Sequence, residues 1–192
     1  ELGIPQEAIV AGTVSRLFKE KGHTFLLDAL SQLPALDTPL HLLIVGTGDE
    51  RERLEAQAKT LGISDKICFA GFYDDLTGAL RAMDIFVQPS IDHEGFPTSV
   101  LEAQAAGLPV IASDIGGTHE TMNVGTTGIL VPPANTPALA EALRMLAVDT
   151  EKRAAMAAAA RPWIENSFTL QHMLEQIAAT YHEAHACYNA RT

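Results

Sequence analysis

The sequence is short of cysteine and has no long apolar run. Its two cysteines, Cys68 and Cys187, give no reason to infer a disulfide framework or a four-ligand zinc site, so both are predicted to be free thiols. No apolar stretch approaches the roughly 20 residues that a membrane-spanning helix needs, and no signal peptide with a basic start and a small-residue cleavage site opens the chain. These absences predict a soluble domain in the cytoplasm.

Basic residues are also few. The chain has 13 lysines and arginines against 24 aspartates and glutamates, which gives a formal net charge of −11. Binding to nucleic acid relies on clustered cations that neutralise phosphates, and the sequence has no basic stripe, so we expect no nucleic-acid partner. A small anionic ligand would instead need a few cations placed locally against the prevailing negative field.

What the chain does have is hydrophobic residues, 47% of its 192 positions, in short runs that alternate with amphipathic stretches. Apolar runs such as 40–45 and 110–113 are typical of strands buried on both faces of a parallel sheet. Stretches such as 24–33, whose apolar residues recur at helical spacing, predict helices between the strands. Five or six such alternations predict an α/β fold, namely a Rossmann-like open parallel sheet with helices on both faces.

We interpret residues 1–192 as a single domain, which is long enough for a sizeable buried core. The core is expected at about residues 8–148 and the carboxyl-terminal helices at about 151–186. Within these parts, Thr136 is the predicted N-cap of one helix, and Pro162 is predicted to break another.

Two groups of side chains could suggest a metal site. His182, His185 and Cys187 are spaced to share a helix face, but neighbouring ligands are sparse in the sequence, so we predict no metal there. Asp74 and Asp75 precede a predicted helix, where capping and the helix dipole explain adjacent carboxylates.

Residues 93–107 are the most informative stretch. They follow a strand predicted at 84–88 and read His-Glu-Gly-Phe-Pro-Thr-Ser-Val-Leu-Glu-Ala-Gln-Ala-Ala-Gly. Glycine and proline disfavour a helix up to Pro97, whereas good helix formers follow, so a helix is predicted to begin at Thr98 or Ser99. Its first-turn N–H groups lack partners and lie at the positive end of the helix dipole, which makes them a seat for a phosphate.

Two carboxylates lie beside this predicted seat: Glu94 comes just before it, and Glu102 lies one turn inside the helix. Because carboxylates aimed at a phosphate would repel it, uncharged donors such as sugar hydroxyls are their more suitable targets. The expected ligand therefore carries both phosphate and hydroxyl groups. The alternative is that Ser99 and Glu102 simply form a capping box, which is common at helix starts.

Three cations, Arg16, Lys19 and Lys21, follow the first predicted strand. Arginine suits bidentate phosphate contacts and lysine acts more as a point charge, although a loop can equally carry solvated cations. Parallel sheets bind ligands at the carboxyl ends of their strands, where these cations, Glu94 and Glu102 are all predicted to lie. This convergence favours ligand binding.

The stretch from Glu94 to Glu102 resembles the E-x7-E element of retaining glycosyltransferases of family 4, which have the two-domain GT-B fold. The resemblance implies that Glu94 lies near the hydroxyls of the donor sugar and that Glu102 holds the nucleotide ribose. It implies that Arg16 and Lys21 close on the donor diphosphate from the opposite side of the cleft. The backbone expected to meet the diphosphate is that of Gly95, Phe96, Pro97, Thr98 and Ser99.

Other loops take roles from the same resemblance. Gly46 and Gly48 are expected to line the edge of the donor cleft, and Phe72 to lie at a strand exit against the nucleotide base, although an aromatic there is more often part of the core. Gly116 and Gly117 are expected to bring backbone close to a ligand. Gly46-Thr-Gly48 could also be taken for a dinucleotide fingerprint, but Arg51 stands where the third glycine would be.

The resemblance therefore implies the donor-binding, carboxyl-terminal domain of a retaining glycosyltransferase that moves a sugar from a nucleotide diphosphate to an acceptor. The catalytic residues would be Glu94, Arg16 and Lys21. No metal and no other cofactor is expected, because Arg16, Lys21 and the helix N-terminus supply positive charge. The amino-terminal acceptor domain is expected to be absent from this chain, so the fragment alone should bind a donor and transfer nothing. Any peripheral membrane association would come only through that missing domain.

Two alternatives remain open from the sequence. One is a nucleotide-sugar 2-epimerase, which shares the fold and also needs a second domain. The other is a non-catalytic nucleotide- or flavin-binding regulatory module of the flavodoxin or receiver type, although the chain lacks a recognisable receiver acidic cluster or flavin phosphate loop. The sequence does not specify the base, the sugar or the acceptor.

Overall fold

Six of the predicted apolar runs form one parallel sheet in the computed structural model, which describes residues 3–189. The strands are β1 (Ile9–Val14), β2 (Leu40–Val45), β3 (Ile67–Gly71), β4 (Ile85–Gln88), β5 (Val110–Ser113) and β6 (Gly128–Val131). They lie in the order β3-β2-β1-β4-β5-β6, and all neighbouring pairs are parallel. The predicted open parallel sheet is confirmed.

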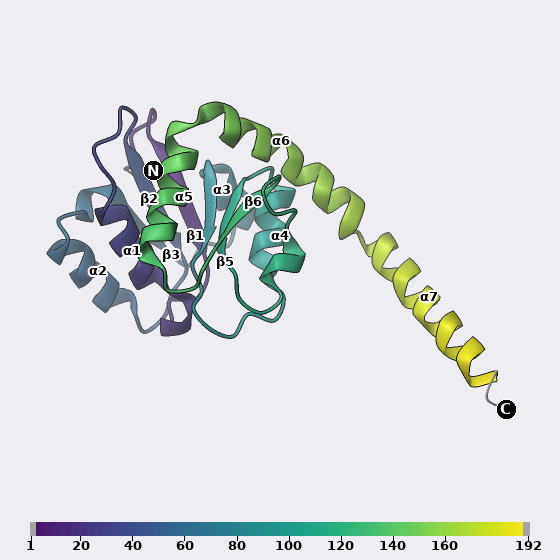
Figure 1. Cartoon of the computed structure of the whole chain (residues 1–192). Helices are drawn as coiled ribbons and strands as arrows, with labels where there is room; N and C mark the ends of the chain where they lie inside the picture. Colours follow the sequence, from purple (N-terminus) through teal and green to yellow (C-terminus); the bar gives the residue numbers. More distant parts are fainter. Residues whose placement is uncertain (1–2, 190–192) are drawn as a thin grey trace.

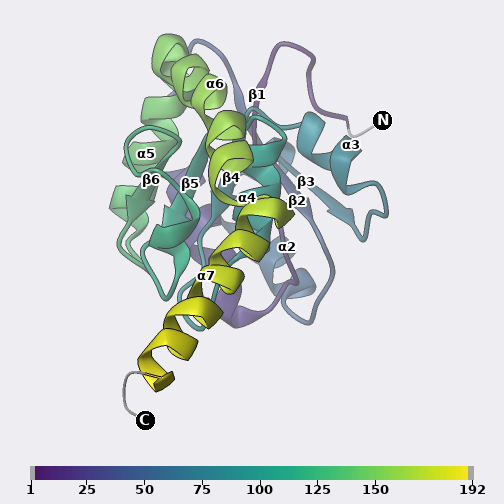
Figure 2. The same cartoon turned by 90° about the vertical axis from the view of Figure 1, so that its right-hand side faces the viewer.

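Helices connect the strands and cover both faces of the sheet (Figures 1 and 2). The α-helices are α1 (His23–Ser31), α2 (Arg51–Thr60), α3 (Leu76–Arg81), α4 (Thr98–Ala105), α5 (Thr136–Val148), α6 (Thr150–Ser167) and α7 (Leu170–Asn189). The described residues also form three short 3-10 helices: η1 (Lys19–Lys21), η2 (Ser64–Lys66) and η3 (Thr118–Thr121).

The core has two layers because successive strand residues point to opposite faces. In β1, Ile9 packs with α1, α2 and α5 on one face, whereas Val10 packs with α3 and α4 on the other. Both layers are built from fully buried aliphatic side chains such as Leu27 and Val100. Because helices cover both faces of the sheet, the loops at the carboxyl ends of its strands are the expected place for a ligand-binding site.

The order of the strands decides which loops meet. Along the chain, β1, β2 and β3 extend the sheet in one direction, after which β4 is added on the other side of β1. The loops after β1 and β4 therefore leave adjacent strands in opposite directions. This is the switch point at which open parallel sheets leave a crevice for ligands.

Two predictions for the helices after the core were wrong. Asn135, and not Thr136, is the N-cap of α5, since its Oδ1 accepts a hydrogen bond of 3.0 Å from the backbone N–H of Ala138. Pro162 lies inside α6 and does not break it. The carbonyl of Ala158 loses its helical partner at Pro162, but both residues are exposed, so water can solvate that carbonyl.

The opposite face of α6 packs against α4 and α5, with Met156 and Ala160 buried, and this packing keeps the helix continuous. The real break comes at Phe168, where α6 ends and the chain turns into α7.

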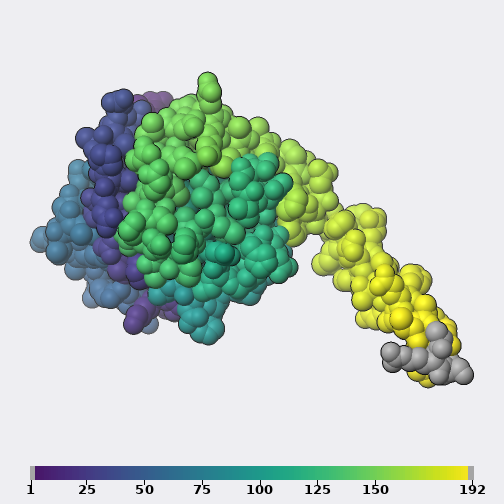
Figure 3. All heavy atoms as spheres, viewed as in Figure 1, coloured from purple at the N-terminus to yellow at the C-terminus, as the bar shows by residue number. Residues whose placement is uncertain are grey.

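Helix α7 projects from the rest of the molecule (Figures 1 and 3), and none of its residues is buried. Its large exposed apolar side chains are Leu170, Met173, Leu174, Ile177, Tyr181 and Tyr188. Of the helices within residues 3–189, none combines the length and the apolar character needed to cross a membrane.

Both cysteines are free, as predicted: Cys68 is half-buried in β3 and Cys187 is exposed on α7. In the part of the chain that the structure describes, no three His, Cys, Asp or Glu side chains are grouped to hold a metal ion. His185 instead lies 3.2 Å from the side-chain amide of Asn189.

Candidate functional site

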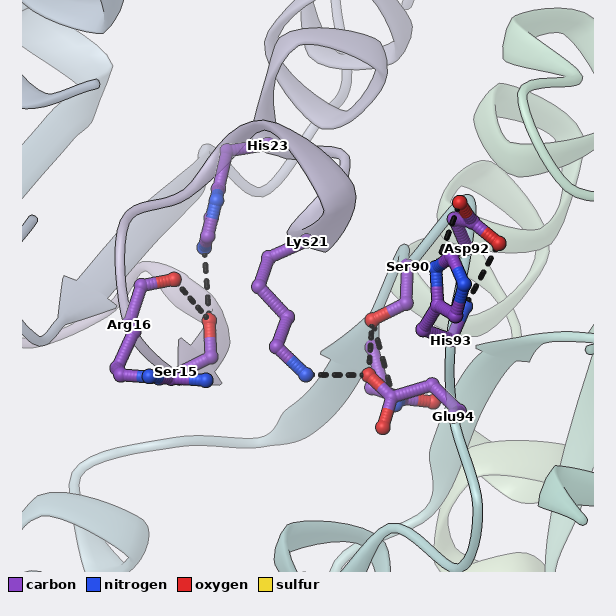
Figure 4. Close-up of polar contacts among 9 residues, drawn as sticks. Ser15, Arg16, Lys21, His23, Ser90, Asp92, His93 and Glu94 are labelled. Atoms are coloured by element: carbon purple, nitrogen blue, oxygen red, sulfur yellow. Dashed lines mark hydrogen bonds and ion pairs between the residues drawn. The ribbon is translucent and has the colours of Figure 1, made fainter. Parts of the chain in front are cut away.

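Lys21 and Glu94 form an ion pair across the switch point of the sheet, although 73 positions separate them in the chain. Lys21 Nζ lies 2.6 Å from Glu94 Oε1. Lys21 comes from η1, which follows β1, and Glu94 from the loop that follows β4; Figure 4 shows the two side chains pointing toward one another. Two residues predicted separately for the site are therefore in direct contact.

The backbone brings these two loops together. The N–H of Ile91 donates to the carbonyl of Glu20 at 2.8 Å. Gly22 has φ of 68°, and a Cβ at this position would collide with the carbonyl oxygen of Pro89. Only glycine allows both the left-handed turn and the close approach, so Gly22 fixes the position from which Lys21 reaches Glu94.

Ser90 is a further partner of Glu94 that the sequence did not indicate. Its Oγ donates to Glu94 Oε1 at 2.6 Å, and both residues are buried. Gln88 Nε2 donates in turn to Ser90 Oγ at 3.4 Å. Glu94 Oε1 thus accepts from Ser90 and Lys21, whereas Oε2 accepts no hydrogen bond from residues 3–189.

The backbone of the loop that carries Glu94 contacts Gly116 and Gly117, which follow β5. The N–H of Gly117 donates to the carbonyls of Glu94 and Gly95, at 3.2 and 3.1 Å. A Cβ on Gly116, which has φ of 55°, would collide with the carbonyl oxygen of Glu94. These glycines were expected to approach a ligand; in the structure, their close approach is to the backbone that positions Glu94.

The helix predicted to offer a phosphate seat begins at Thr98, where it was predicted to begin. Its N-cap is Pro97, and no side chain forms a capping hydrogen bond. The alternative capping box of Ser99 and Glu102 is therefore not formed. The side chain of Glu102 is exposed and makes no hydrogen bond or ion pair with the described residues, whereas its backbone carbonyl accepts from the N–H of Ala106 at 3.0 Å. The first turn of α4 is free of side-chain acceptors, as an anion site requires.

Arg16, Gly46 and Phe72 line one pocket of about 210 Å³, to which Ser15 and Tyr73 also contribute. Arg16 is exposed, and its guanidinium carbon lies 4.8 Å from the centroid of the Phe18 ring. Phe72 is 74% exposed, so it is not a core residue. The structure thus joins three predicted site residues from three different loops.

Gly46 and Gly48 have a structural role beside this pocket. The loop after β2 runs along the loop after β1, and Ser15 and Leu17 donate backbone hydrogen bonds to Val45 and Thr47 at 3.1 and 2.8 Å. A Cβ on Gly46 or Gly48 would collide with the backbone of the facing loop. Close contact between loops accounts for this glycine pair without a dinucleotide.

His23 lies close to Ser15 and Lys21, and the sequence did not indicate it as part of the site. It is the first residue of α1, is 2% exposed, and its Nε2 lies 3.0 Å from Ser15 Oγ. Burial, with a smaller contribution from the nearby Lys21 ammonium, lowers the pKa of His23 to about 4. His23 is therefore neutral near pH 7 and adds no positive charge to that of Arg16 and Lys21.

Residues 1–163 match the family model described as glycosyl transferases group 1. The chain is 31% identical to the 2-deoxystreptamine glucosyltransferase of Streptomyces kanamyceticus, covering 93% of this chain and 47% of that protein. It is 36% identical to the GDP-mannose-dependent monoacylated alpha-(1-6)-phosphatidylinositol monomannoside mannosyltransferase of Corynebacterium glutamicum, covering 92% of this chain and 48% of that protein. The chain thus spans about half the length of these curated relatives.

The chain is also similar to solved structures of glycosyl transferases and related proteins. The Anabaena protein Alr3699/HepE in complex with UDP is similar with a TM-score of 0.84 and 30% identity, covering 92% of this chain and 49% of that one. The same protein has also been solved with UDP and glucose. The carboxyl-terminal domain of the group 1 glycosyl transferase LpcC from Francisella tularensis has a TM-score of 0.76 and 27% identity, covering 84% of this chain and 87% of that one.

Proposed function

The chain belongs to the group 1 glycosyl transferases, and from this we propose that it is the carboxyl-terminal, donor-binding domain of a retaining glycosyltransferase of family 4. The observation that carries the proposal is the Lys21–Glu94 pair at the switch point, of which Glu94 lies in the loop that leads into α4, whose N-terminus has no side-chain cap. This places a cation, helix N–H groups and a free carboxylate oxygen at one edge of the sheet. They match the diphosphate and hydroxyl groups of a nucleotide sugar.

In the reaction, the bond between the anomeric carbon of the sugar and the diphosphate oxygen breaks, that carbon bonds to an oxygen of the acceptor, and negative charge develops on the departing nucleoside diphosphate. Arg16, Lys21 and the N-terminus of α4 stabilise that charge, as positive groups that lie near the site before the bond breaks. Since these groups supply the positive charge, the transfer needs no metal ion. The sugar keeps its anomeric configuration in the product.

The carboxylates select the donor. Glu94 is held by Lys21 and Ser90 through one oxygen, and its other oxygen accepts a hydrogen bond from a sugar hydroxyl. Glu102, exposed one turn inside α4, binds the hydroxyls of the nucleotide ribose. The pocket beside Arg16 and Phe72 receives the base.

The relatives support this assignment, and their nucleotides indicate which bases the donor could carry. The Anabaena neighbour was solved with UDP, whereas the Corynebacterium relative is named as dependent on GDP-mannose, so the base of the donor is open between them. A second, amino-terminal domain would bring the acceptor, and it would also make any contact with a membrane surface. The chain alone then binds the donor without transferring the sugar. The family match favours transfer over the 2-epimerase and over a regulatory flavodoxin-like or receiver-like module.

The test is calorimetric titration of the chain with uridine, guanosine and adenosine diphosphates, with and without magnesium. We expect one of them to bind without the metal and to lose affinity in Glu102→Ala. Lys21→Ala should weaken binding by about tenfold or more, because it removes a charge-assisted contact. Lys59→Ala, which removes the same charge from the exposed last turn of α2, serves as the control.

An unchanged affinity in Lys21→Ala would contradict the role of Lys21. If none of the three nucleotides binds, the same titration on the full-length protein decides whether the site needs its second domain. Absence of binding there as well would refute the donor site.

A further inference from the structure

Three aromatic rings connect the loop after β4 to the junction between α6 and α7. The ring centroids of Phe96 and Phe168 are 5.9 Å apart at an interplanar angle of 56°, and those of Phe168 and Trp163 are 6.0 Å apart at 72°. Both are tilted or edge-on arrangements at distances that aromatic pairs favour. Phe96 lies two residues after Glu94, whereas Phe168 follows α6, so the contact joins distant parts of the chain.

The loop around Phe96 has a buried residue on either side, Glu94 and Pro97, and an exposed stretch between them. Its backbone is bonded from behind through Gly117, which donates to the carbonyls of Glu94 and Gly95. On the outer side, Gly95 and Phe96 are exposed, and Phe96 remains 45% exposed even with Phe168 against it. His93 has φ of 52°, an uncommon conformation for a residue other than glycine. A loop with this backbone needs contacts that hold it.

Phe168 is well placed to supply such a contact because it is itself fixed. It follows the last turn of α6, where its N–H donates to the carbonyl of Ile164 at 2.9 Å. Helix α6 packs against α4, the helix that the loop leads into. Trp163, within α6, also packs against the Phe168 ring, and its indole Nε1 is buried with no acceptor among residues 3–189.

We propose that Phe168 is a positioning residue for the donor site: through the ring of Phe96 it holds the backbone of residues 95–97 so that the N-terminus of α4 faces the diphosphate. Phe168 does not touch the ligand in this account. The inference rests on the proposed function for its ligand, but the contact between the loop and the end of α6 can be tested without any ligand.

The first test is hydrogen–deuterium exchange of the whole chain without nucleotide. In Phe168→Ala we expect the amides of residues 92–99 to exchange several-fold faster, while those of β1 and β4 keep their protection. Phe168→Tyr, which keeps the ring, should restore the slow exchange. Leu170→Ala, an exposed residue just beyond the junction, should leave the loop unchanged. If the loop exchanges equally in Phe168→Ala and the wild type, the proposal is wrong.

The second test measures uridine and guanosine diphosphate affinity by titration. Phe168→Ala should weaken the nucleotide that the wild type binds by about threefold to tenfold, the effect expected from losing one aromatic contact. Phe96→Ala should have a similar effect, and the double variant should be no weaker than either single one, because both remove the same contact. Additive losses would overturn the proposal.

The two failures can be told apart. If none of the nucleoside diphosphates binds, either to the chain or to the full-length protein, the proposed function fails, and the exchange experiment still decides whether Phe168 holds the loop. If Phe168→Ala is too unstable to study, Phe168→Leu keeps most of the apolar volume without the ring, and it should show the same faster loop exchange.

Discussion

At Glu94, one carboxylate oxygen accepts hydrogen bonds from both Lys21 and Ser90, whereas the other accepts none from the residues that the structure describes. Lys21 is therefore already paired with a carboxylate in the absence of a ligand. Its ammonium is oriented by Glu94, and its remaining N–H groups donate to no other residue that the structure describes. The two residues thus form one unit, in which a change at either affects the contacts of both.

Ser90→Ala tests this unit. The variant leaves Glu94 with one buried hydrogen bond fewer, so we expect the free energy of unfolding to fall by about 1–3 kcal/mol. Because Glu94 is proposed to contact the sugar, affinity for a nucleotide sugar should fall more than affinity for the nucleoside diphosphate alone. Titration with both ligands measures the difference. An equal loss for both would mean that Ser90 acts on the fold and not on the orientation of Glu94.

Ser31→Ala provides the matched control for that variant. It removes a hydroxyl that donates to the carbonyl of Asp28 at 2.8 Å, far from the switch point, and should leave both affinities unchanged.

His23 predicts how stability depends on pH. Its pKa is about 4 in the folded chain, against 6.5 for an unperturbed histidine. Between these values the unfolded chain binds a proton and the folded chain does not, so stability present above pH 6.5 is lost as the pH falls toward 4. The loss amounts to about 3 kcal/mol from this residue, at 1.36 kcal/mol for each tenfold change in proton affinity.

Denaturant unfolding at a series of pH values checks this prediction. Carboxylates also titrate in the range, so the measurement is the difference between the wild type and His23→Gln, which cannot take up the proton. The wild type should lose about 3 kcal/mol more than the variant on acidification. Parallel curves would show that His23 is not held neutral.

At the scale of the elements, glycines allow the site loops to pack backbone to backbone. Gly22 meets the loop after β4, Gly46 meets the loop after β1, and Gly116 meets the carbonyl of Glu94. Two of these have φ near 60°, at 68° and 55° for Gly22 and Gly116, and each would place a Cβ into a facing carbonyl. Gly22 and Gly116 must therefore be glycine for two steric reasons: the positive φ and the close approach of a facing carbonyl.

Gly116→Ala and Gly107→Ala separate those two effects. Gly107, at the end of α4, also has positive φ, at 83°, but a Cβ there would meet nothing within 4 Å. Its substitution should cost only the conformational strain, about 1–2 kcal/mol. Gly116→Ala should cost more, about 3 kcal/mol or above, because the carbonyl of Glu94 must also move. Equal losses in denaturant unfolding would mean that the loops adjust without cost.

At the scale of the whole molecule, the chain divides into a packed sheet with its covering helices and a projecting α7 (Figure 3). No residue of α7 is buried, although its apolar side chains recur at helical spacing. Stability comes mainly from buried apolar area, so α7 should contribute little to the stability of the isolated chain.

Truncation after Thr169 tests that division. The shortened chain should unfold at the same denaturant midpoint and with the same slope as the complete one, because the slope scales with the area exposed on unfolding. A midpoint lowered by more than the experimental error would show that α7 packs onto the core in solution. Phe168 is retained in the truncated chain, so its contact with Phe96 is not affected.

Much of this molecule could be predicted locally. The apolar runs predicted the strands, and the change from Gly95 and Pro97 to good helix formers predicted where α4 begins. Local patterns failed where a distant partner decides: α6 continues through Pro162 because its other face packs on α4. At α5, Thr136 was predicted as the N-cap, but Asn135 takes this place because its side chain accepts from the N–H of Ala138.

The sequence alone determined that the chain would form a parallel α/β sheet and which residue types its loops would present, because hydrophobic periodicity and glycine or proline positions act over a few residues. Only the tertiary structure decided that β4 lies beside β1, and hence that Lys21 meets Glu94, that Ser90 joins them and that Phe168 reaches Phe96. Strand order and side-chain partners depend on how the whole core packs, and contacts between residues distant in the chain leave no local pattern from which they could be read.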